Sequence, residues 1–429
     1  MLDWLFTQTP LVYLTQSLWR DEAFSVLVAE YSFIDIIKIT ANDYTPPLYY
    51  FLLKIWMMVF GRSEEAIRML SFMFYLCTVW VGYKFAKEVI LIKNKWFAPV
   101  AIAMLALNPM LLYYAFEART YSLVALLVVS SLYFLLKHNW KWYVVVATLA
   151  IYAHPYSLLA LVAQGIYVIF WERPLLKVFL KKAGIVGLLY LPWFAVIVSQ
   201  ITRSTEMWYY PVTKELVRAI LGSMFLGYEG TPDILWEWCA KLSVLILGII
   251  AISFFNESAK KVQRLLLLSL FFPLIVVLGI SFITPIFTQR YLIYITVFEI
   301  FLITLGIFSI SNKWLKSILV VSVVSFLFFF NTWYPPQNTK QDFQTPFMEI
   351  NKMMNKEDII LNDSALTFFN AEYYATYPKQ VYLLREDDSP LPSYIGAILI
   401  PKEKWLKDIP RDKRVFMLRE DGNYEIIKS

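Results

Sequence analysis

The sequence predicts an all-α polytopic membrane protein with a small α/β domain at its C-terminal end. Of the 429 residues, 59% are hydrophobic and 17% are charged, whereas soluble proteins are about 25% charged. The mean hydropathy is +0.55. The apolar runs approach the ~20 residues that a membrane helix needs and do not alternate with polar residues, which excludes a β-barrel. Aromatic residues make up 18% of the chain, as expected where many helices cross the membrane–water interface.

The apolar runs predict about 10–12 membrane helices in residues 1–332. Ten spans are expected near 66–86, 96–114, 120–136, 142–154, 156–171, 183–201, 234–255, 265–284, 291–310 and 314–332. Residues 4–18 are apolar but short and interrupted by Thr, Gln and Pro, which is typical of a tilted or shortened first span or of an interfacial helix. Residues 48–60 predict an amphipathic helix that Pro46-Pro47 opens and Gly61 closes.

Charge sorts the loops into two sets. Every second loop is basic, and these loops hold Lys84, Lys87, Lys93, Lys95, Lys137, Lys141, Arg173, Lys177, Lys181, Lys182, Lys260, Lys261, Arg264, Lys313 and Lys316. The positive-inside rule assigns them to the cytoplasm, a better explanation of the net charge of +6 than nucleic-acid binding. The alternate loops, with the polar stretch 19–47 and the loop 202–233, then lie on the extracytoplasmic face.

The composition changes after residue 332. Residues 334–337 read as a linker, and residues 333–429 read as a soluble domain with a helix at 343–355. Short strands are expected at 358–361, 380–384, 396–400, 415–418 and 424–427. Because this domain follows an outward-going span, we expect it outside the cytoplasm.

The first outer loop, residues 19–47, carries the densest polar sequence of the membrane region. Asp21 and Glu22 lie side by side in WRDEAF, and Asp43 precedes Pro46 and Pro47. Carboxylates beside lipid are costly, which favours a function such as a general base at the membrane surface. The alternative is that Asp21 and Glu22 cap a surface helix and that Asp43 is a simple helix cap before the prolines.

Three further outer segments carry candidate site residues. Glu117 and Tyr121 are four residues apart and are expected to share a helix face, and Arg119 between them could reach a phosphate or form a local ion pair. His154 lies at an outer turn, where it is either a site residue or a turn residue. Arg290-Tyr291 opens a span, where the arginine either snorkels or clamps a phosphate. The positive-inside rule does not call for an arginine on the extracytoplasmic face, so phosphate binding by Arg290 is favoured.

Other kinds of site lack support in the sequence. The chain has two histidines, which excludes a three-histidine metal site by count. Cys77 and Cys239 have no CxxC partners. The sequence contains no Walker, GxGxxG or GxSxG motif. Nucleotide-sugars of the cytosol are poorly placed for an outer site, and a lipid-linked sugar suits it better.

The ordered motifs resemble bacterial glycosyltransferase family 39, within the GT-C group that includes protein O-mannosyltransferases and lipid A aminoarabinose transferases. The resemblance covers residues 17–310 and rests on DEAFS (21–25), DYTPPLYYFLLKIW (43–56) with FG (60–61), Glu64, Arg68, Leu70 and Ser71 at one span's start, NPMLLYYAFEARTYSL (108–123), YAHPYSLLALVAQ (152–164) and RYL (290–292). Two features differ from most relatives. Only 20 residues precede the acidic pair, and Asp43 stands near a position that is often histidine.

This resemblance implies an inverting transferase in the plasma or inner membrane. It would move a sugar, mannose by family frequency, from a polyprenyl-monophosphate donor to a lipid, glycan or protein acceptor of the cell envelope, with no obligatory cofactor and with a divalent cation left open. The implied catalytic residues are Asp21, with Glu22 in support, and the implied donor phosphate ligands are Arg290 and Arg119. The expected sugar or acceptor ligands are Asp43, Glu117, Tyr121, His154 and Tyr291.

Two alternatives come from other classes of protein. A non-enzymatic transporter or flippase of lipid-linked glycans would need charged groups within its spans, whereas these charges gather at one face. An envelope receptor or assembly subunit would work through residues 337–429 and would not depend on Asp21.

Overall fold

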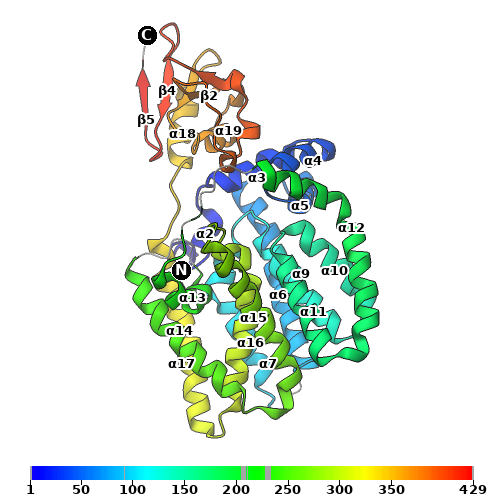
Figure 1. Ribbon diagram of the computed structural model, residues 1–429. Coiled ribbons are helices and arrows are strands. Elements are labelled where there is room, and N and C mark those ends of the chain that lie inside the picture. The colour runs from blue at the N-terminus through cyan, green and yellow to red at the C-terminus, as the bar shows by residue number, and fades with distance from the viewer. Residues whose placement is uncertain (1, 91, 204–208, 210, 228–232, 428–429) are drawn as a thin grey trace.

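The computed structural model describes residues 2–90, 92–203, 209, 211–227 and 233–427. A bundle of helices forms the body, and a small α/β domain stands at one end of it (Figure 1). The predicted fold class is therefore confirmed: the protein is a helical, multi-pass membrane protein with a small C-terminal α/β domain.

Five helices in the described part of the chain are long and apolar enough to cross a membrane. They are α6 (Glu64–Glu88), α12 (Leu176–Arg203), α14 (Asp233–Ser253), α15 (Lys260–Ser281) and α17 (Lys313–Trp333). A sixth span, predicted at 96–114, is divided into α7 (Phe97–Leu107) and α8 (Pro109–Ala115), which meet at 53°. Pro109 begins α8, and the Asn108 side chain caps it by accepting from the Leu111 N–H at 3.1 Å.

Five more apolar helices coincide with predicted segments but are shorter than a full span. These are α5 (Leu48–Phe60), α9 (Tyr121–Leu136), α10 (Trp140–Ala153), α11 (Ser157–Trp171) and α16 (Tyr294–Ser309). Every residue of α16 from Tyr294 to Phe308 is buried. α16 packs against α14 so closely that a Cβ on Gly306 would overlap the carbonyl oxygen of Ile249. Small residues of this kind let membrane helices approach each other.

The N-terminal segment does not form a single helix. It folds as α1 (Leu2–Gln8) and α2 (Val12–Thr15), so the expectation of one span or one interfacial helix at 4–18 is wrong. Thr9 and Pro10 lie between the two helices, and α2 packs against α6. The loop 19–47 is also helical and consists of α3 (Arg20–Glu30) and α4 (Phe33–Asn42).

The C-terminal domain begins after the 3-10 turn Pro335–Gln337 and contains α18 (Gln344–Met353), α19 (Phe368–Tyr374) and a five-stranded sheet. The strands are β1 (Ile359–Asn362), β2 (Val381–Leu384), β3 (Trp405–Leu406), β4 (Val415–Leu418) and β5 (Tyr424–Ile427), in the order β3-β2-β1-β4-β5. Only β5 is antiparallel to its neighbour, with Val415 opposite Ile427. Other short 3-10 turns are Arg173–Leu175, Glu257–Ala259, Gln289–Leu292, Pro378–Gln380, Ser393–Ile395, Ala397–Leu399 and Lys402–Lys404.

One prediction within this domain is wrong, and one helix was missed. The strand expected at 396–400 is a 3-10 turn that starts after Gly396, whose φ of 80° lies in the left-handed region. This backbone conformation does not continue into an extended strand. The helix α19 was not anticipated from the sequence. It packs against α3 of the first loop.

The C-terminal domain and the first-loop helices share one hydrophobic core. Phe24 of α3 and Tyr50 of α5 are buried in the same cluster as Phe347 of α18 and Phe369 of α19. The rings of Phe24 and Phe369 are 5.3 Å apart at 60°. The domain is thus packed onto the end of the bundle where α3, α4 and α5 lie (Figure 1).

Candidate active site

Asp21 lies in the first turn of α3, at the end of the bundle that faces the C-terminal domain. Trp19 precedes the helix in an extended conformation, and its N–H donates to Glu22 Oε2 at 3.5 Å. The acidic pair therefore does start a helix, as one reading of the sequence expected. That helix is not a surface helix, because most of α3, including Ala23 and Val26, is buried.

Three arginines from separate parts of the chain surround the Asp21 carboxylate. Arg20 Nη2 lies 3.1 Å from Oδ1, whereas Arg290 Nη1 and Arg119 Nη2 lie 3.7 and 3.9 Å from Oδ2. Burial alone would raise the pKa of Asp21, but Arg119, Arg20 and Arg290 together hold it well below its usual range. Asp21 is therefore ionised at any physiological pH.

Glu22 faces away from this cluster and joins three other segments. It pairs with Arg68 of α6 at 2.7 Å, and both side chains are fully buried. The same arginine donates to the carbonyl oxygens of Leu14 and Ser17, both at 3.0 Å. Burial opposes ionisation of Glu22, yet Arg68 and then Lys340 keep its pKa below the usual value. Glu22 holds the loop in place and does not contact the cavity described below.

The turn that precedes α9 brings Arg119 to Asp21. Glu22 Oε1 accepts from the Ala118 N–H at 2.9 Å, and Arg119 Nη1 donates to Ser25 Oγ at 3.2 Å. One expectation is wrong here. Glu117 and Tyr121 do not share a helix face, because α9 begins only at Tyr121.

Arg119 also does not form the local ion pair that the sequence left open as an alternative. Glu117 pairs with Lys340 at 3.0 Å, and Arg119 turns to Asp21. Burial raises the pKa of Glu117, and although Lys340 lowers it and Glu22 raises it further, the net direction is upward.

Asp43 ends α4 and lines the opposite side of the same space. Gln200 of α12 fixes the end of the helix by donating to the backbone carbonyl oxygens of Thr40, at 3.0 Å, and of Asp43. Burial raises the pKa of Asp43 to about 6, although Arg119 and the backbone N–H of Tyr44 act against this rise. Asp43 therefore changes charge in the range where a general base or a hydrogen-bonding acid works.

The segment before α16 contributes Arg290 and Tyr291. The Arg290 guanidinium lies over the rings of Trp19 and Tyr121, 5.6 Å from each centroid. His154 packs behind Tyr291, with their ring centroids 4.4 Å apart. Burial lowers the pKa of His154 to about 3, so its ring is neutral.

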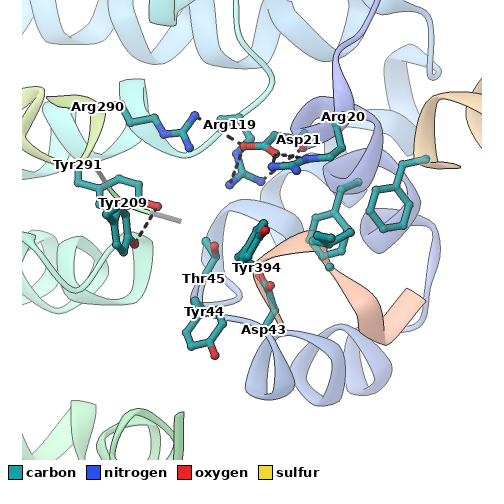
Figure 2. A pocket seen from close by; sticks show the side chains of 14 residues that line it. Arg20, Asp21, Asp43, Tyr44, Thr45, Arg119, Tyr209, Arg290, Tyr291 and Tyr394 are labelled. Carbon is teal, nitrogen blue, oxygen red and sulfur yellow. Dashed lines mark hydrogen bonds and ion pairs between the residues drawn. The ribbon is translucent and has the colours of Figure 1, made fainter. Parts of the chain in front are cut away.

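These groups enclose a cavity of about 110 Å³ between the bundle and the C-terminal domain (Figure 2). Of the nine candidates, Asp21, Asp43, Arg119, Arg290 and Tyr291 line it, whereas Glu22, Glu117, Tyr121 and His154 lie behind the wall in the described structure. The remaining lining residues are Arg20, Phe24, Tyr44, Thr45, Tyr209, Phe369, Tyr394, Ile395 and Gly396.

Several of these residues were not identified from the sequence as site residues. Arg20 could have been found, because it is adjacent to Asp21. Phe369, Tyr394, Ile395 and Gly396 belong to the C-terminal domain. No motif marks them, since the family resemblance ends at residue 310.

The cavity has the charge of an anion site. Three guanidinium groups face two carboxylates, and Asp43 is partly protonated near pH 6. Planar guanidinium groups suit phosphate oxygens. Within the described residues, no three or more His, Cys, Asp or Glu side chains come together as a metal site.

Comparison with known proteins identifies the fold. The sequence profile of the family described as dolichyl-phosphate-mannose-protein mannosyltransferase matches residues 44–199. ArnT from Cupriavidus metallidurans is similar over 97% of this chain and 91% of its own, with a TM-score of 0.61 and 11% identity in the apo state. The corresponding values for ArnT bound to undecaprenyl phosphate are a TM-score of 0.62 and 12% identity, with the same coverage.

An archaeal protein is also similar. AglB from Archaeoglobus fulgidus, an oligosaccharyltransferase in complex with an inhibitory peptide and a dolichol-phosphate, matches with a TM-score of 0.53 and 11% identity over 97% of this chain and 68% of its own. No curated protein sequence matches the chain. The protein therefore has the fold of the GT-C glycosyltransferases, and the resemblance predicted from the sequence is confirmed.

Proposed function

We propose that the protein is an inverting glycosyltransferase that moves a sugar from a polyprenyl-monophosphate donor to a hydroxyl group of a cell-envelope acceptor. The observation that carries this proposal is the position of Asp21, which lies among Arg20, Arg119 and Arg290 in a cavity at one end of a membrane bundle. A lipid phosphate and a sugar are the substrate parts that such a cavity can hold. The solved relatives contain undecaprenyl phosphate or dolichol-phosphate, which supports this donor class.

The donor phosphate would bind Arg290 and Arg119. Both arginines now share Asp21 Oδ2, at 3.7 and 3.9 Å. A phosphodiester carries one negative charge, and it gains a second when the sugar leaves. The arginines stabilise this growing negative charge. In the transition state, the charge on the departing phosphate is the one that most needs stabilisation.

Asp21 would act as the base. The acceptor oxygen forms a bond to the anomeric carbon, and the bond from that carbon to the phosphate oxygen breaks with its electron pair. The proton of the acceptor hydroxyl passes to Asp21, and a single displacement inverts the anomeric configuration. The three arginines make Asp21 a weak base in the empty site. A bound phosphate competes for Arg119 and Arg290, so donor binding raises the basicity of Asp21 at the step that needs it.

Asp43 and Tyr291 would hold sugar or acceptor hydroxyls at the cavity wall. Glu22 and Glu117 would keep Asp21 and Arg119 in place from behind. Tyr121 and His154 would support Arg290 and Tyr291, because their rings contact these residues. Mannose is the first sugar to test, since the matching profile is named for a mannosyltransferase. The site and the C-terminal domain would face the extracytoplasmic side, as the basic loops predict.

The experiment measures sugar transfer by purified protein in lipid nanodiscs, with polyprenyl-phosphate mannose or aminoarabinose as donors and envelope lipids, glycans and peptides as acceptors. We expect Asp21→Asn to lower turnover at least about 100-fold, the range of a lost general base. Binding of undecaprenyl phosphate should persist, because the arginines remain.

Asp35→Asn is the matched control, since Asp35 lies in the same loop but is exposed and pairs with Lys38. It should keep normal turnover. Near-normal turnover by folded Asp21→Asn would exclude the proposed role. Lipid translocation by the wild type with no modified acceptor would favour a transporter instead.

A further inference from the structure

The linker to the C-terminal domain places one lysine behind the wall of the candidate site. Lys340 lies between α17 and α18, more than 200 positions after Glu117, yet its Nζ is 3.0 Å from Glu117 Oε2. Its ammonium lies over the rings of Trp19, at 4.4 Å, and Tyr113, at 5.4 Å. Only 11% of the side chain is exposed. A lysine in a flexible tether would be solvated.

The linker is held at this lysine and again a few residues after it. The Lys340 N–H donates to Gln16 Oε1 at 2.9 Å. Ser17 Oγ accepts from the N–H groups of Phe343, at 2.9 Å, and Gln344, at 2.8 Å. These bonds fix the backbone, so the ammonium group has a defined position with respect to the first loop.

Lys340 completes the charge balance of a buried cluster. Glu22 and Glu117 are 0% and 2% exposed at their side chains. Arg68 neutralises Glu22 at 2.7 Å, and Lys340 is the ion-pair partner of Glu117, while also lying 3.9 Å from Glu22 Oε2. Without Lys340, Glu117 would stay buried beside Glu22 without its ion-pair partner. A buried charge that loses its partner is strongly unfavourable.

The same cluster holds the turn that carries Arg119. Glu117 and Arg119 belong to one tight turn, in which the Arg119 N–H donates to the Glu117 carbonyl oxygen at 2.7 Å. Glu22 holds the next amide in this turn, that of Ala118. Displacement of Glu117 would therefore move Arg119 relative to Asp21. Shifts of about 1 Å at a reacting centre cost on the order of 100-fold in rate.

We infer that Lys340 is a positioning residue of the transferase, acting through Glu117 to hold Arg119 against Asp21. This inference rests on the proposed function. It makes the linker and the attached C-terminal domain a working part of the active site, and it assigns Glu117 to the support of Arg119 in place of direct sugar binding.

The test combines charge removal with a double-mutant cycle. Lys340→Met should lower kcat for sugar transfer about tenfold or more, whereas Lys340→Arg, which keeps the charge, should recover most of the rate. Glu117→Gln removes the buried carboxylate that needs the lysine. In the Glu117→Gln background, Lys340→Met should therefore cost less than about threefold, because the two residues act as one unit.

Lys356→Met is the matched control, because Lys356 is an exposed lysine of the same domain, and its transfer rate should equal that of the wild type. The thermal unfolding midpoint of each variant is measured in parallel, and Lys340→Met should lower it more in the wild-type background than beside Glu117→Gln. If Lys340→Met does not fold, Lys340→Arg and the double variant still supply the rate comparison.

Two results would overturn the inference: normal transfer by Lys340→Met, or losses for Lys340→Met and Glu117→Gln that simply multiply. A wild-type protein that transfers no sugar would contradict the proposed function. The contact between Lys340 and Glu117 would then be judged by the unfolding midpoints alone. Equal losses of stability with and without Glu117→Gln would exclude it.

Discussion

Arg68 of α6 and Glu22 of α3 form an ion pair of 2.7 Å in which both side chains are completely buried. Arg68 Nε also donates to Glu22 Oε1 at 2.9 Å. Further donors of the same guanidinium bond the carbonyl oxygens of Leu14 and Ser17. One side chain thus ties the N-terminal segment and the helix of Asp21 to the membrane bundle.

The first prediction concerns the stability of this tie. Arg68→Met should destabilise the protein by about 3–5 kcal/mol, because Glu22 is left buried without its main partner. The thermal unfolding midpoint in detergent or nanodiscs should fall by several degrees. Removal of both charges in Glu22→Gln/Arg68→Met should recover part of the loss. A double variant that is less stable than Arg68→Met would contradict the explanation.

Arg62→Met provides the control for this experiment. Arg62 pairs with Glu30 at 2.8 Å, but about half of its side chain is exposed. Exposed ion pairs contribute little to stability. Its unfolding midpoint should therefore stay close to that of the wild type.

The second prediction concerns the donor phosphate. Arg290→Lys keeps the positive charge but removes the planar pair of donors, so undecaprenyl phosphate should bind about tenfold more weakly. Isothermal titration or competition with a labelled lipid phosphate measures this change. Arg419→Lys, at an exposed arginine of the C-terminal domain, should leave binding unaffected. Equal affinity of Arg290→Lys and the wild type would place the phosphate elsewhere.

The third prediction follows from Asp43. Burial raises its pKa to about 6, with Arg119 and Asp21 as the charged groups that face it. If the ionised form binds an acceptor hydroxyl, transfer should rise as the pH increases through about 6. Asp43→Asn should remove this inflection. The neutral His154, with a pKa of about 3, does not titrate in this range.

Asp43 also affects stability, in the opposite direction. Because its folded pKa lies above the ordinary value, the folded state binds the proton more tightly, and stability decreases as the pH rises from about 4 to 6. In Asp43→Asn, the contribution of this carboxyl group to the decrease in stability should disappear.

Glu372→Gln is the control for the pH dependence assigned to Asp43, because a second carboxyl group titrates in a similar range. Burial raises the pKa of Glu372 to about 7, with Lys404 and Glu30 facing it. Glu372 does not line the cavity in the described structure. Its variant should keep the activity inflection near pH 6. Loss of the inflection in Glu372→Gln, and not in Asp43→Asn, would refute the assignment.

The fourth prediction tests whether the part of the C-terminal domain that lines the cavity contacts the acceptor. Gly396 has a φ of 80°, and an added Cβ would lie 2.8 Å from the Phe24 ring. Gly396→Ala should therefore shift Tyr394 and Ile395 away from the cavity and raise the KM for the acceptor several-fold. Steady-state kinetics at saturating donor measures this change.

Gly422→Ala is the matched control for backbone strain. Gly422 has a φ of 82° in the same domain but meets mainly the flexible side chain of Gln341. Both variants should lose stability to a similar extent, and only Gly396→Ala should change the KM. An unchanged KM in Gly396→Ala would mean that this wall does not contact the acceptor.

The sequence alone was sufficient for the membrane class, the GT-C resemblance and most helices. Apolar runs are local signals, and burial in a bundle or in lipid forces backbone hydrogen bonds to be made within each helix. Helix ends such as Gly61 after α5 follow from single residues in the same way. Five of the nine candidate residues also line the cavity, since polar groups at one membrane face have few other places to lie.

Only the tertiary structure could bring Lys340 to Glu117, or Gly396 to Phe24. These pairs join segments that are hundreds of residues apart, and no local pattern records which surface of the C-terminal domain packs on α3. The sequence predicted that Glu117 and Tyr121 share a helix face and that 396–400 is a strand. Both predictions were wrong because residue spacing and propensity do not report tertiary contacts, such as those of Glu117 with Lys340 and of Gly396 with Phe24. The sequence by itself determined which polar residues were available at one end of the bundle. The shared hydrophobic core of the two domains, and the buried ion pairs at its edge, decided which of them meet around Asp21.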